Sequence, residues 1–418
     1  MASGVHRTIY INAGPIAHFS GGDIDKPLVG IQMSSDEQLH EPGMAFVVEN
    51  KSFRKISTTE EILAEYGVDS QTYDLEGCAI VPGYIDAHTH LVWAGDRAQE
   101  IRMRQRGMSY SQIANAGGGI RYTVNETRKC TDVSLRNIGQ ARLTTALKHG
   151  TTAIEAKSGY GLNTKCEKEI LDAYSILNEN GPEQHNPDIY LTWMGAHDIP
   201  HGVQKSDYVE HLISEQLPEI GEQGISQYAD VFCEPGWFSL EDTEDICRAA
   251  IEQGLEIRLH VDEFTDGGGL ELAAELGAVT ADHSIHSTDD ARSAAADAGV
   301  LQGFLPGTPY VMGSDKWPPL QKCIEEEWPW TLATDFNPNC PTLSLPMVGS
   351  FVTHRLDIDP IAALAAVTRN AASGLSGSNQ QGVITEGAIA NFNQLESKHI
   401  ESWCQSPGHS AIKKTWLA

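Results

Sequence analysis

The chain has 418 residues, 40% of them hydrophobic, and a formal net charge of −28. This length allows one large domain and a smaller one, with a sizeable buried core. The negative charge argues against a nucleic-acid partner, because such binding needs a basic surface. We attribute the acidity to solubility or salt adaptation, and an anionic ligand would need a local cation at its site.

The eight cysteines are spread along the chain and form no Cys-x-x-Cys pair. This pattern is typical of a reduced intracellular protein rather than of a disulfide framework or a zinc finger. Residues 1–20 lack the charged start and apolar core of a signal peptide. No apolar run approaches the roughly 18 residues of a membrane span. The sequence therefore predicts a cytoplasmic protein with no membrane partner.

Both ends of the chain contain short strand-like pieces. Residues 1–78 include alternating runs such as Thr8–Ile11 and Met44–Val48, separated by Gly, Asp and Pro clusters, and similar pieces return after Gly382. Such a rhythm is typical of short β-strands. We therefore expect a second, smaller β-sandwich domain built from both chain termini, residues 1–78 and 376–418.

The central residues 79–375 have a different rhythm, in which apolar strand candidates alternate with helical stretches. This alternation predicts right-handed βαβ units and a parallel sheet. Eight such units indicate an α/β fold of the (β/α)8 TIM-barrel type. Arg97–Arg128 is an insertion between the first two strands, and Asp359–Leu375 predicts a helix after the barrel. The eight candidates are Ala79–Asp86, Thr151–Ser158, Ile189–His197, Tyr228–Glu234, Glu256–Glu263, Ala278–Ile285, Val300–Thr308 and Trp330–Phe336.

The strongest local signal is an apolar strand that ends in His88-Thr89-His90. Side chains two residues apart on an extended segment point to the same side, so both imidazoles can face one ion. Two polar loop histidines are the alternative interpretation, and the pair alone does not decide between them.

Other ligand-type residues fall at the ends of later strand candidates. His260 lies near the end of the fifth, His283 lies within the sixth and Asp335 within the eighth. Catalytic side chains of a (β/α)8 barrel gather at the C-terminal ends of its strands. Each of these residues alone is more often structural, but five such groups at one rim indicate a metal site.

Imidazoles with one carboxylate suit zinc or iron better than Mg²⁺ or Ca²⁺. We assign one divalent or trivalent transition metal ion, Zn or Fe, to His88, His90, His260 and Asp335, with room for a water. A two-metal site would want a bridging ligand, often a modified lysine at the end of strand four. The fourth candidate strand has no lysine, which favours one ion.

A set of short motifs runs in order through the barrel region. It opens with Pro82-Gly83-x-x-Asp86-x-His88-x-His90, and the later motifs are Ala94–Arg97, Asn115–Ile120, Glu155–Leu162, Gly195–His197, His260–Phe264, Leu305–Thr308 and Thr334–Pro338. The opening pattern is similar to the start of the barrel in the amidohydrolase superfamily. The later motifs narrow the likeness, and the ordered set resembles the imidazolonepropionase family of that superfamily. The N-terminal β region matches only loosely.

The resemblance implies a reaction in histidine breakdown. A metal-activated water would open the ring of 4-imidazolone-5-propanoate, a small anionic heterocycle, to give N-formimidoyl-L-glutamate. Glu263 would move a proton between this water and the departing nitrogen, and His283 would polarise the ring carbonyl or stabilise the oxyanion. Asp335 would combine metal binding with orienting the water.

The resemblance also implies contacts to the substrate. Arg97 would bind the propionate, since a guanidinium grips a carboxylate with two hydrogen bonds, although an ordinary surface ion pair is the alternative. This chain departs from the family pattern at two of the implied positions: it has Asn339 where relatives often have glycine, and Cys340 where they often have a hydroxyl residue. A homodimer is a further expectation from the family. The other implied contacts are Glu263 itself, Tyr160, His197, Asn337, Asn339 and Cys340.

Two alternatives stay open at the level of sequence. The same fold supports other amidohydrolase reactions, such as deamination of a heterocyclic base or opening of a hydantoin-like ring. A barrel that serves only as an interaction scaffold is the second alternative, but such a protein typically lacks metal ligands, and this chain has the whole set.

Overall fold

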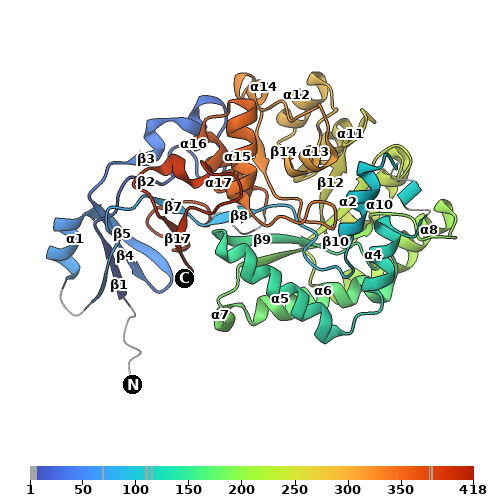
Figure 1. Ribbon diagram of the computed structural model, residues 1–418, viewed down its shortest axis with the longest axis horizontal. Coiled ribbons are helices and arrows are strands. Elements are labelled where there is room, and N and C mark those ends of the chain that lie inside the picture. Colours follow the sequence, from blue (N-terminus) through green and yellow to red (C-terminus); the bar gives the residue numbers. More distant parts are fainter. Residues whose placement is uncertain (1–6, 68–69, 109–111, 114–115, 376, 378–379) are drawn as a thin grey trace.

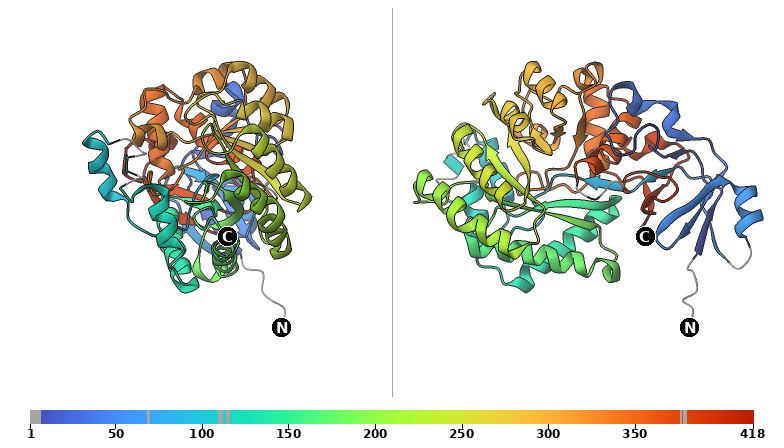
Figure 2. Two further views of the ribbon diagram at one scale, coloured as in Figure 1. Left: turned by 90° about the vertical axis from the view of Figure 1, so that its right-hand side faces the viewer. Right: turned by 180° about the vertical axis from the view of Figure 1, so that it is seen from behind.

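The computed structural model describes the chain except residues 1–6, 68–69, 109–111, 114–115, 376 and 378–379, so that Asn115 of the quoted motifs lies outside the described residues. Eight parallel strands stand side by side in chain order, as expected for the predicted barrel, and helices surround them (Figures 1 and 2). The strands are β8 (Tyr84–Asp86), β9 (Thr151–Lys157), β10 (Asp188–Ala196), β11 (Tyr228–Cys233), β12 (Glu256–Val261), β13 (Thr280–His283), β14 (Leu301–Phe304) and β15 (Trp330–Leu332).

The barrel closes just beyond the ends of its first and last strands. Thr89, after β8, forms a parallel bridge with Phe336, after β15. The backbone N–H of His90 donates to the Phe336 carbonyl at 2.9 Å, and the N–H of Asp335 donates to the His88 carbonyl at 3.2 Å. Three of the predicted metal ligands therefore lie on the two segments that close the barrel mouth, meaning the C-terminal ends of its strands.

The first predicted strand, Ala79–Asp86, is in fact two strands that belong to different sheets. β7 (Ile80–Pro82) pairs with strands of the small domain, whereas β8 pairs with β9 of the barrel. Gly83 stands between them, and a Cβ there would lie 2.2 Å from Oγ1 of Thr152. The chain can pass from one sheet to the other here because glycine has no side chain.

Two small sheets form the predicted sandwich at one end of the molecule (Figure 1). The strand order is β5-β4-β1-β6 in one sheet and β17-β16-β7-β2-β3 in the other, so the second sheet combines both chain ends. Aromatic rings join the sheets: Tyr10 lies 5.1 Å from Phe392 and 4.9 Å from Trp416, centroid to centroid. The strands are β1 (Arg7–Ile11), β2 (Ile16–Ala17), β3 (Leu39–His40), β4 (Met44–Glu49), β5 (Ser52–Thr58), β6 (Gln71–Asp74), β16 (Phe392–Leu395) and β17 (Ile412–Trp416).

The sandwich is thus confirmed, while the boundaries at residues 78 and 375 stay a prediction. The helix expected over Asp359–Leu375 is two helices, α16 (Pro360–Ala366) and α17 (Arg369–Ser373). The buried Arg369 begins the second one and donates to the carbonyls of Phe19 and Lys26. This contact ties the N-terminal segment to the barrel.

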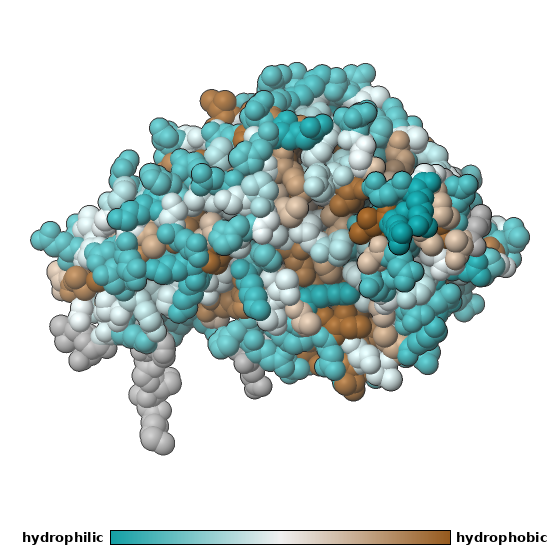
Figure 3. Space-filling view, in the orientation of Figure 1, coloured by the Kyte–Doolittle hydropathy of each residue, from teal (hydrophilic) through white to brown (hydrophobic). Residues whose placement is uncertain are grey.

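Most of the remaining helices cover the barrel or lie in its loops, whereas the helix Thr59–Tyr66 packs on β4 and β5 of the small domain (Figure 1). Among the described residues no helix is long and apolar enough to cross a membrane. Hydrophilic side chains cover most of the face in Figure 3, with smaller apolar patches between them. The helices are α1 (Thr59–Tyr66), α2 (Ala98–Gln105), α4 (Gly119–Thr127), α5 (Asp132–Lys148), α6 (Thr164–Glu179), α7 (Gly181–Gln184), α8 (Lys205–His211), α9 (Leu217–Gln223), α10 (Leu240–Glu252), α11 (Gly269–Leu276), α12 (Asp289–Asp297), α13 (Gly307–Met312), α14 (Leu320–Glu325) and α15 (Leu345–Leu356), with short helical turns η1 (Gly30–Ser34), η2 (Asp36–Gln38), η3 (Leu212–Gln216) and η4 (Ile400–Trp403).

Candidate metal centre and active site

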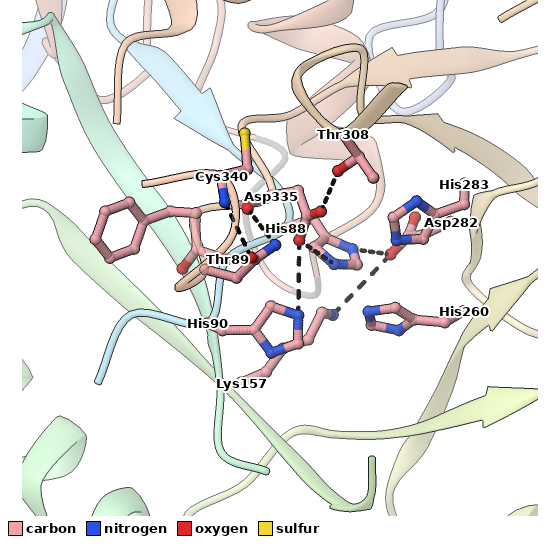
Figure 4. Close-up of polar contacts among 12 residues, drawn as sticks. His88, Thr89, His90, Lys157, His260, Asp282, His283, Thr308, Asp335 and Cys340 are labelled. Carbon is pink, nitrogen blue, oxygen red and sulfur yellow. Dashed lines mark hydrogen bonds and ion pairs between the residues drawn. The ribbon is translucent and has the colours of Figure 1, made fainter. Parts of the chain in front are cut away.

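The two histidines after β8 both face the carboxylate of Asp335 (Figure 4). Nε2 of His88 and Nε2 of His90 each lie 3.7 Å from Oδ1 of Asp335. Asp335 follows β15 by three residues and has a left-handed backbone with φ of 50°. His283, the last residue of β13, is also left-handed, with φ of 69°. Such conformations are uncommon outside glycine and occur often at functional sites.

The metal-type side chains form two overlapping groups that share His88. One group is His88, His90 and Asp335, and the other is His88, His260 and His283; within each, one ligand atom per residue lies within 4.8 Å of the others. The predicted set is therefore gathered around His88, but its four members do not form a single group at this spacing. His283, expected to act on the substrate, belongs to the second group, with its ring centroid 5.7 Å from that of His88, against 4.5 Å for His260.

The donor set fits a transition metal. Of the two imidazoles after β8, that of His88 has its Nε2, the atom facing Asp335, buried and without a hydrogen-bond partner among the described residues. Burial lowers the pKa of both imidazoles well below its ordinary value, with nearby Lys157 and the other histidines adding to the effect. Neutral imidazole is the form that binds a metal, and a buried nitrogen without a partner is costly unless something coordinates it.

A group of buried charges that sequence analysis did not single out lies beneath the histidines. It comprises Glu155, Lys157, Asp230, Arg258 and Asp282, all 2% exposed or less, and we call it the ionic cluster. Burial opposes the charge on Lys157, but Asp230 and Glu155 raise its pKa above the ordinary value. Burial would likewise raise the pKa of Asp230, but His260 and Lys157 hold it below the ordinary value. The sequence feature that could have indicated this cluster is the presence of charged residues within otherwise apolar strands.

Glu263 lies two residues beyond β12, not within the strand as expected, and its carboxylate faces His283. Oε2 of Glu263 is 3.8 Å from Nε2 of His283. Burial raises the pKa of Glu263 well above its ordinary value, and Asp335 and Glu234 add to the effect. The buried Glu234 accepts hydrogen bonds from the backbone N–H groups of Glu263, Phe264 and Thr265, which fixes the loop that carries Glu263.

A cavity of about 340 Å³ opens at the barrel mouth above these groups. Every residue predicted to contact a substrate lines it, together with most of the predicted ligands. Sequence analysis missed its aromatic wall and the apolar residues near α13, whose types carry no chemical signature. The lining is His90, Arg97, Ile120, Tyr160, His197, Phe232, Trp237, His260, Glu263, Phe264, His283, Thr308, Val311, Met312, Asp335, Asn337, Asn339 and Cys340.

Arg97 reaches the cavity from the insertion but is paired with a neighbour. Its Nε and Nη2 donate to the two carboxylate oxygens of Glu100 at 2.8 and 2.9 Å, and both side chains are buried. Oε1 of Glu100 also accepts from the backbone N–H of Gly119 at 2.7 Å. The surface ion pair considered as an alternative is therefore a buried pair that fixes the guanidinium at the cavity wall.

Tyr160 and His197 are neighbours in the cavity wall, with ring centroids 5.1 Å apart. Nδ1 of His197 lies 3.0 Å from the Gly159 carbonyl, which can only accept, so Nδ1 carries the proton. Burial, with His260, lowers the pKa of His197 to about 3, so the ring is neutral at physiological pH. Glu167 holds the loop of Tyr160: its carboxylate accepts from the N–H groups of Gly159, Gly161 and Leu162 at 2.6–2.7 Å.

Polar side chains of the loop after β15 form hydrogen bonds mainly within that loop. The Asn337 amide donates to the Asp335 carbonyl at 2.8 Å, and its oxygen accepts from the N–H groups of Asn339 and Cys340. Burial raises the pKa of the Cys340 thiol to about 12, and Asp335 adds to the effect, so Cys340 is not a thiolate nucleophile at neutral pH. All three residues line the cavity, with Asn337 bracing the loop.

Comparison with curated proteins shows the family. The chain is 39% identical to the imidazolonepropionase of Solibacter usitatus over 380 residues, which are 90% of each chain. It is 37% identical to that of Halobacterium salinarum, again over 90% of each chain, and 36% identical to that of Haloarcula marismortui, over 84% of this chain and 83% of that one. The chain belongs to the imidazolonepropionase family. The sequence resemblance is thereby confirmed, although no family model matches the chain.

Solved structures confirm the fold of this family member. The 5-methylcytosine deaminase of Klebsiella pneumoniae superposes with a TM-score of 0.70 at 14% identity, covering 98% of this chain and 95% of that one. A guanine deaminase of C. acetobutylicum gives 0.67 at 13% identity, covering 99% of both chains. An atrazine chlorohydrolase of Arthrobacter aurescens, complexed with zinc, gives 0.67 at 14% identity, covering 98% of this chain and 94% of that one. As a member of the imidazolonepropionase family, the chain is a hydrolase acting on C–N bonds in cyclic amides. The His and Asp groups at its barrel mouth could hold a metal ion.

We predict that Glu167→Ala lowers the free energy of unfolding by about 3 kcal/mol, because three N–H groups of the Tyr160 loop lose a charged acceptor. Urea unfolding followed by circular dichroism measures the change. Glu179→Ala, at an exposed position on the same helix α6, is the matched control and should change stability by less than about 0.5 kcal/mol. Equal effects of the two substitutions would contradict the role given to Glu167.

Proposed function

We propose that the chain hydrolyses 4-imidazolone-5-propanoate to N-formimidoyl-L-glutamate. The observation that carries the proposal is a single cavity lined by metal-type imidazoles, Asp335, the carboxylate of Glu263 and the guanidinium of Arg97. Membership of the imidazolonepropionase family supplies the substrate. The Arg97 guanidinium supplies the local cation that an anionic substrate needs in an acidic protein.

The proposed ligands are His88, His90, His260 and Asp335, which together would hold one zinc or iron ion. When bound, such an ion supplies an activated water at neutral pH and polarises a carbonyl. Strand β11 has no lysine that could bridge a second ion, and its Asp230 already contacts His260 and Lys157. The absence of a bridging lysine from this strand favours a single ion per chain.

Glu263 and His283 carry the proton and charge movements of the proposed reaction. The water oxygen adds to the ring carbonyl carbon, the ring C–N bond breaks, and a carboxylate is released. Glu263 takes a proton from the attacking water and delivers it to the departing nitrogen, a task favoured by its raised pKa. His283, within 3.8 Å of Glu263, stabilises the developing oxyanion.

Three parts of the cavity wall hold the substrate in this proposal. Arg97, fixed by Glu100, binds the propionate. His197 has its proton on Nδ1, so its Nε2 lone pair accepts a hydrogen bond from a ring N–H. The aromatic wall of Phe232, Trp237 and Phe264 contacts the flat heterocycle, beside Tyr160.

A cytoplasmic location belongs to the same proposal and is supported by eight free cysteines, seven of them buried. The homodimer expected from the family stays a prediction.

We expect purified protein to open freshly prepared imidazolonepropionate and to contain about one zinc or iron ion per chain, because a tetrahedral or similar site is filled by one ion. Chelation should abolish turnover, and adding back Zn²⁺ or Fe²⁺ should restore it. Absorbance of the imidazolone and metal analysis provide the measurements. Turnover of guanine, cytosine or hydantoin with no action on imidazolonepropionate would overturn the proposed substrate.

We predict that Glu263→Gln keeps the metal content but lowers kcat by about 100-fold or more, since the amide cannot accept the proton of the water. Steady-state kinetics with parallel metal analysis test this. Glu271→Gln, a partly exposed position on α11, is the matched control and should turn over like the parent chain. A kcat near the parent value in Glu263→Gln would remove Glu263 from proton transfer.

Arg97→Ala should mainly raise KM, by about 10-fold or more, because its contact exists in both the bound substrate and the transition state. Since this change leaves Glu100 buried without its guanidinium, the double variant Arg97→Ala/Glu100→Gln is measured beside it. Both variants should show the raised KM. An unchanged KM in both would exclude Arg97 from the substrate site.

A further inference from the structure

Lys157 occupies the centre of the ionic cluster, where carboxylates from three strands converge on its ammonium. Nζ lies 2.8 Å from Asp230 Oδ2 on β11, 2.9 Å from Glu155 Oε1 on β9 and 4.0 Å from Asp282 Oδ2 on β13. Its side chain is 0% exposed, and Figure 4 shows it beneath the histidines with a contact toward Asp282. No substrate can reach it there, so its role must act through its neighbours.

Two of these carboxylates each hold a proposed metal ligand. Asp230 Oδ1 lies 2.9 Å from Nδ1 of His260, and Asp282 Oδ2 lies 2.7 Å from Nδ1 of His88. An ionised carboxylate only accepts, so each imidazole carries its proton on Nδ1 and presents Nε2 as a lone pair. For His88 this nitrogen is buried and 3.7 Å from Asp335. One ammonium therefore contacts the partners of two ligands from different strands.

The other cation of the ionic cluster, Arg258, makes its side-chain hydrogen bonds to backbone carbonyls. Arg258 donates to the carbonyls of Gly374 and Ala87 at 2.8 Å each, and its nearest approaches to Asp282 and Glu155 are 3.7 and 4.0 Å. Lys157 is the nearest cation to Asp230 and Glu155, whereas Asp282 lies 3.7 Å from Arg258 and 4.0 Å from Lys157. Without Lys157, Asp230 and Glu155 would lose their nearest cation in a dry interior, and Arg258 alone would offset the repulsion among the three carboxylates.

We propose that Lys157 is a positioning residue for the metal centre, which fixes Asp230 and Asp282 and thereby aims Nε2 of His260 and His88 at a shared ion. The proposal rests on the ligand set given under the proposed function. Lys157 makes no contact with the reacting atoms, so its removal should change metal affinity before it changes the chemistry of loaded protein.

The test is the dissociation constant for Zn²⁺ of chelator-stripped protein, measured by competition with a chromophoric chelator. Lys157→Met should raise this constant by about 10- to 100-fold, the usual effect of losing a partner of a metal ligand. Lys168→Met, at a partly exposed ion pair on α6, is the matched control and should bind Zn²⁺ like the parent chain.

Lys157→Met leaves Asp230 and Glu155 without their nearest cation and can fold poorly, so the double variant Lys157→Met/Asp230→Asn is measured as well. It removes one charge of each sign, and the asparagine oxygen can still accept from His260. We expect it to recover the thermal midpoint of the parent apoprotein while its affinity for Zn²⁺ stays about 10-fold weaker or more.

Parent-like affinity in the refolded double variant would overturn the proposal, because Lys157 would then serve folding alone. A parent chain that binds no Zn²⁺ would instead overturn the ligand set, and with it the proposed function. Weak affinity in a stable double variant supports the positioning role.

Discussion

The barrel mouth depends on keeping charged groups ordered in an interior without water. Glu155, Lys157, Asp230, Arg258 and Asp282 are almost fully buried. Such groups persist only when each charge is paired and hydrogen-bonded. These pairs also orient the imidazoles. Asp282 on β13 contacts Nδ1 of His88, and Asp230 on β11 contacts Nδ1 of His260, so Nε2 of each ring is left for a ligand. The backbone bridge between Thr89 and Phe336 then sets His90 and Asp335 beside them.

A second constraint is the use of buried carboxylates as acceptors for loop backbone. Glu167 fixes the Tyr160 loop, Glu234 fixes the Glu263 loop, and Asp86 accepts from the N–H and hydroxyl of Thr334 beside Asp335. Each loop thus approaches the cavity with its N–H groups satisfied, which holds catalytic side chains at a rim that is otherwise irregular. The fold itself admits many reactions, so the reaction depends on the side chains that these loops present to the cavity.

The sequence alone predicted the parts of the molecule that have a regular hydrophobic pattern or several motif residues close together. Eight apolar strands alternating with helices predicted the barrel, and the strand ends placed His88, His260 and Asp335 at one mouth. Local pattern could not show that Gly83 divides one apolar run between two sheets, since the cause is a close approach of Thr152. Nor could it show that Glu100 grips Arg97, that Asn337 braces its own loop, or that Lys157 meets carboxylates of two other strands. Those contacts depend on side chains that only the folded barrel brings together.

The position of the ion can be determined by a crystal structure of metal-loaded protein, with anomalous scattering recorded at the metal absorption edge. We expect one anomalous peak within coordinating distance, about 2.0–2.3 Å, of Nε2 of His88, His90 and His260 and of an Asp335 oxygen. In that structure Asp230 and Asp282 should remain on the two Nδ1 atoms and Lys157 between them. A peak away from these residues, or an ion held by Nδ1 of His88 or His260, would contradict the proposed ligand set.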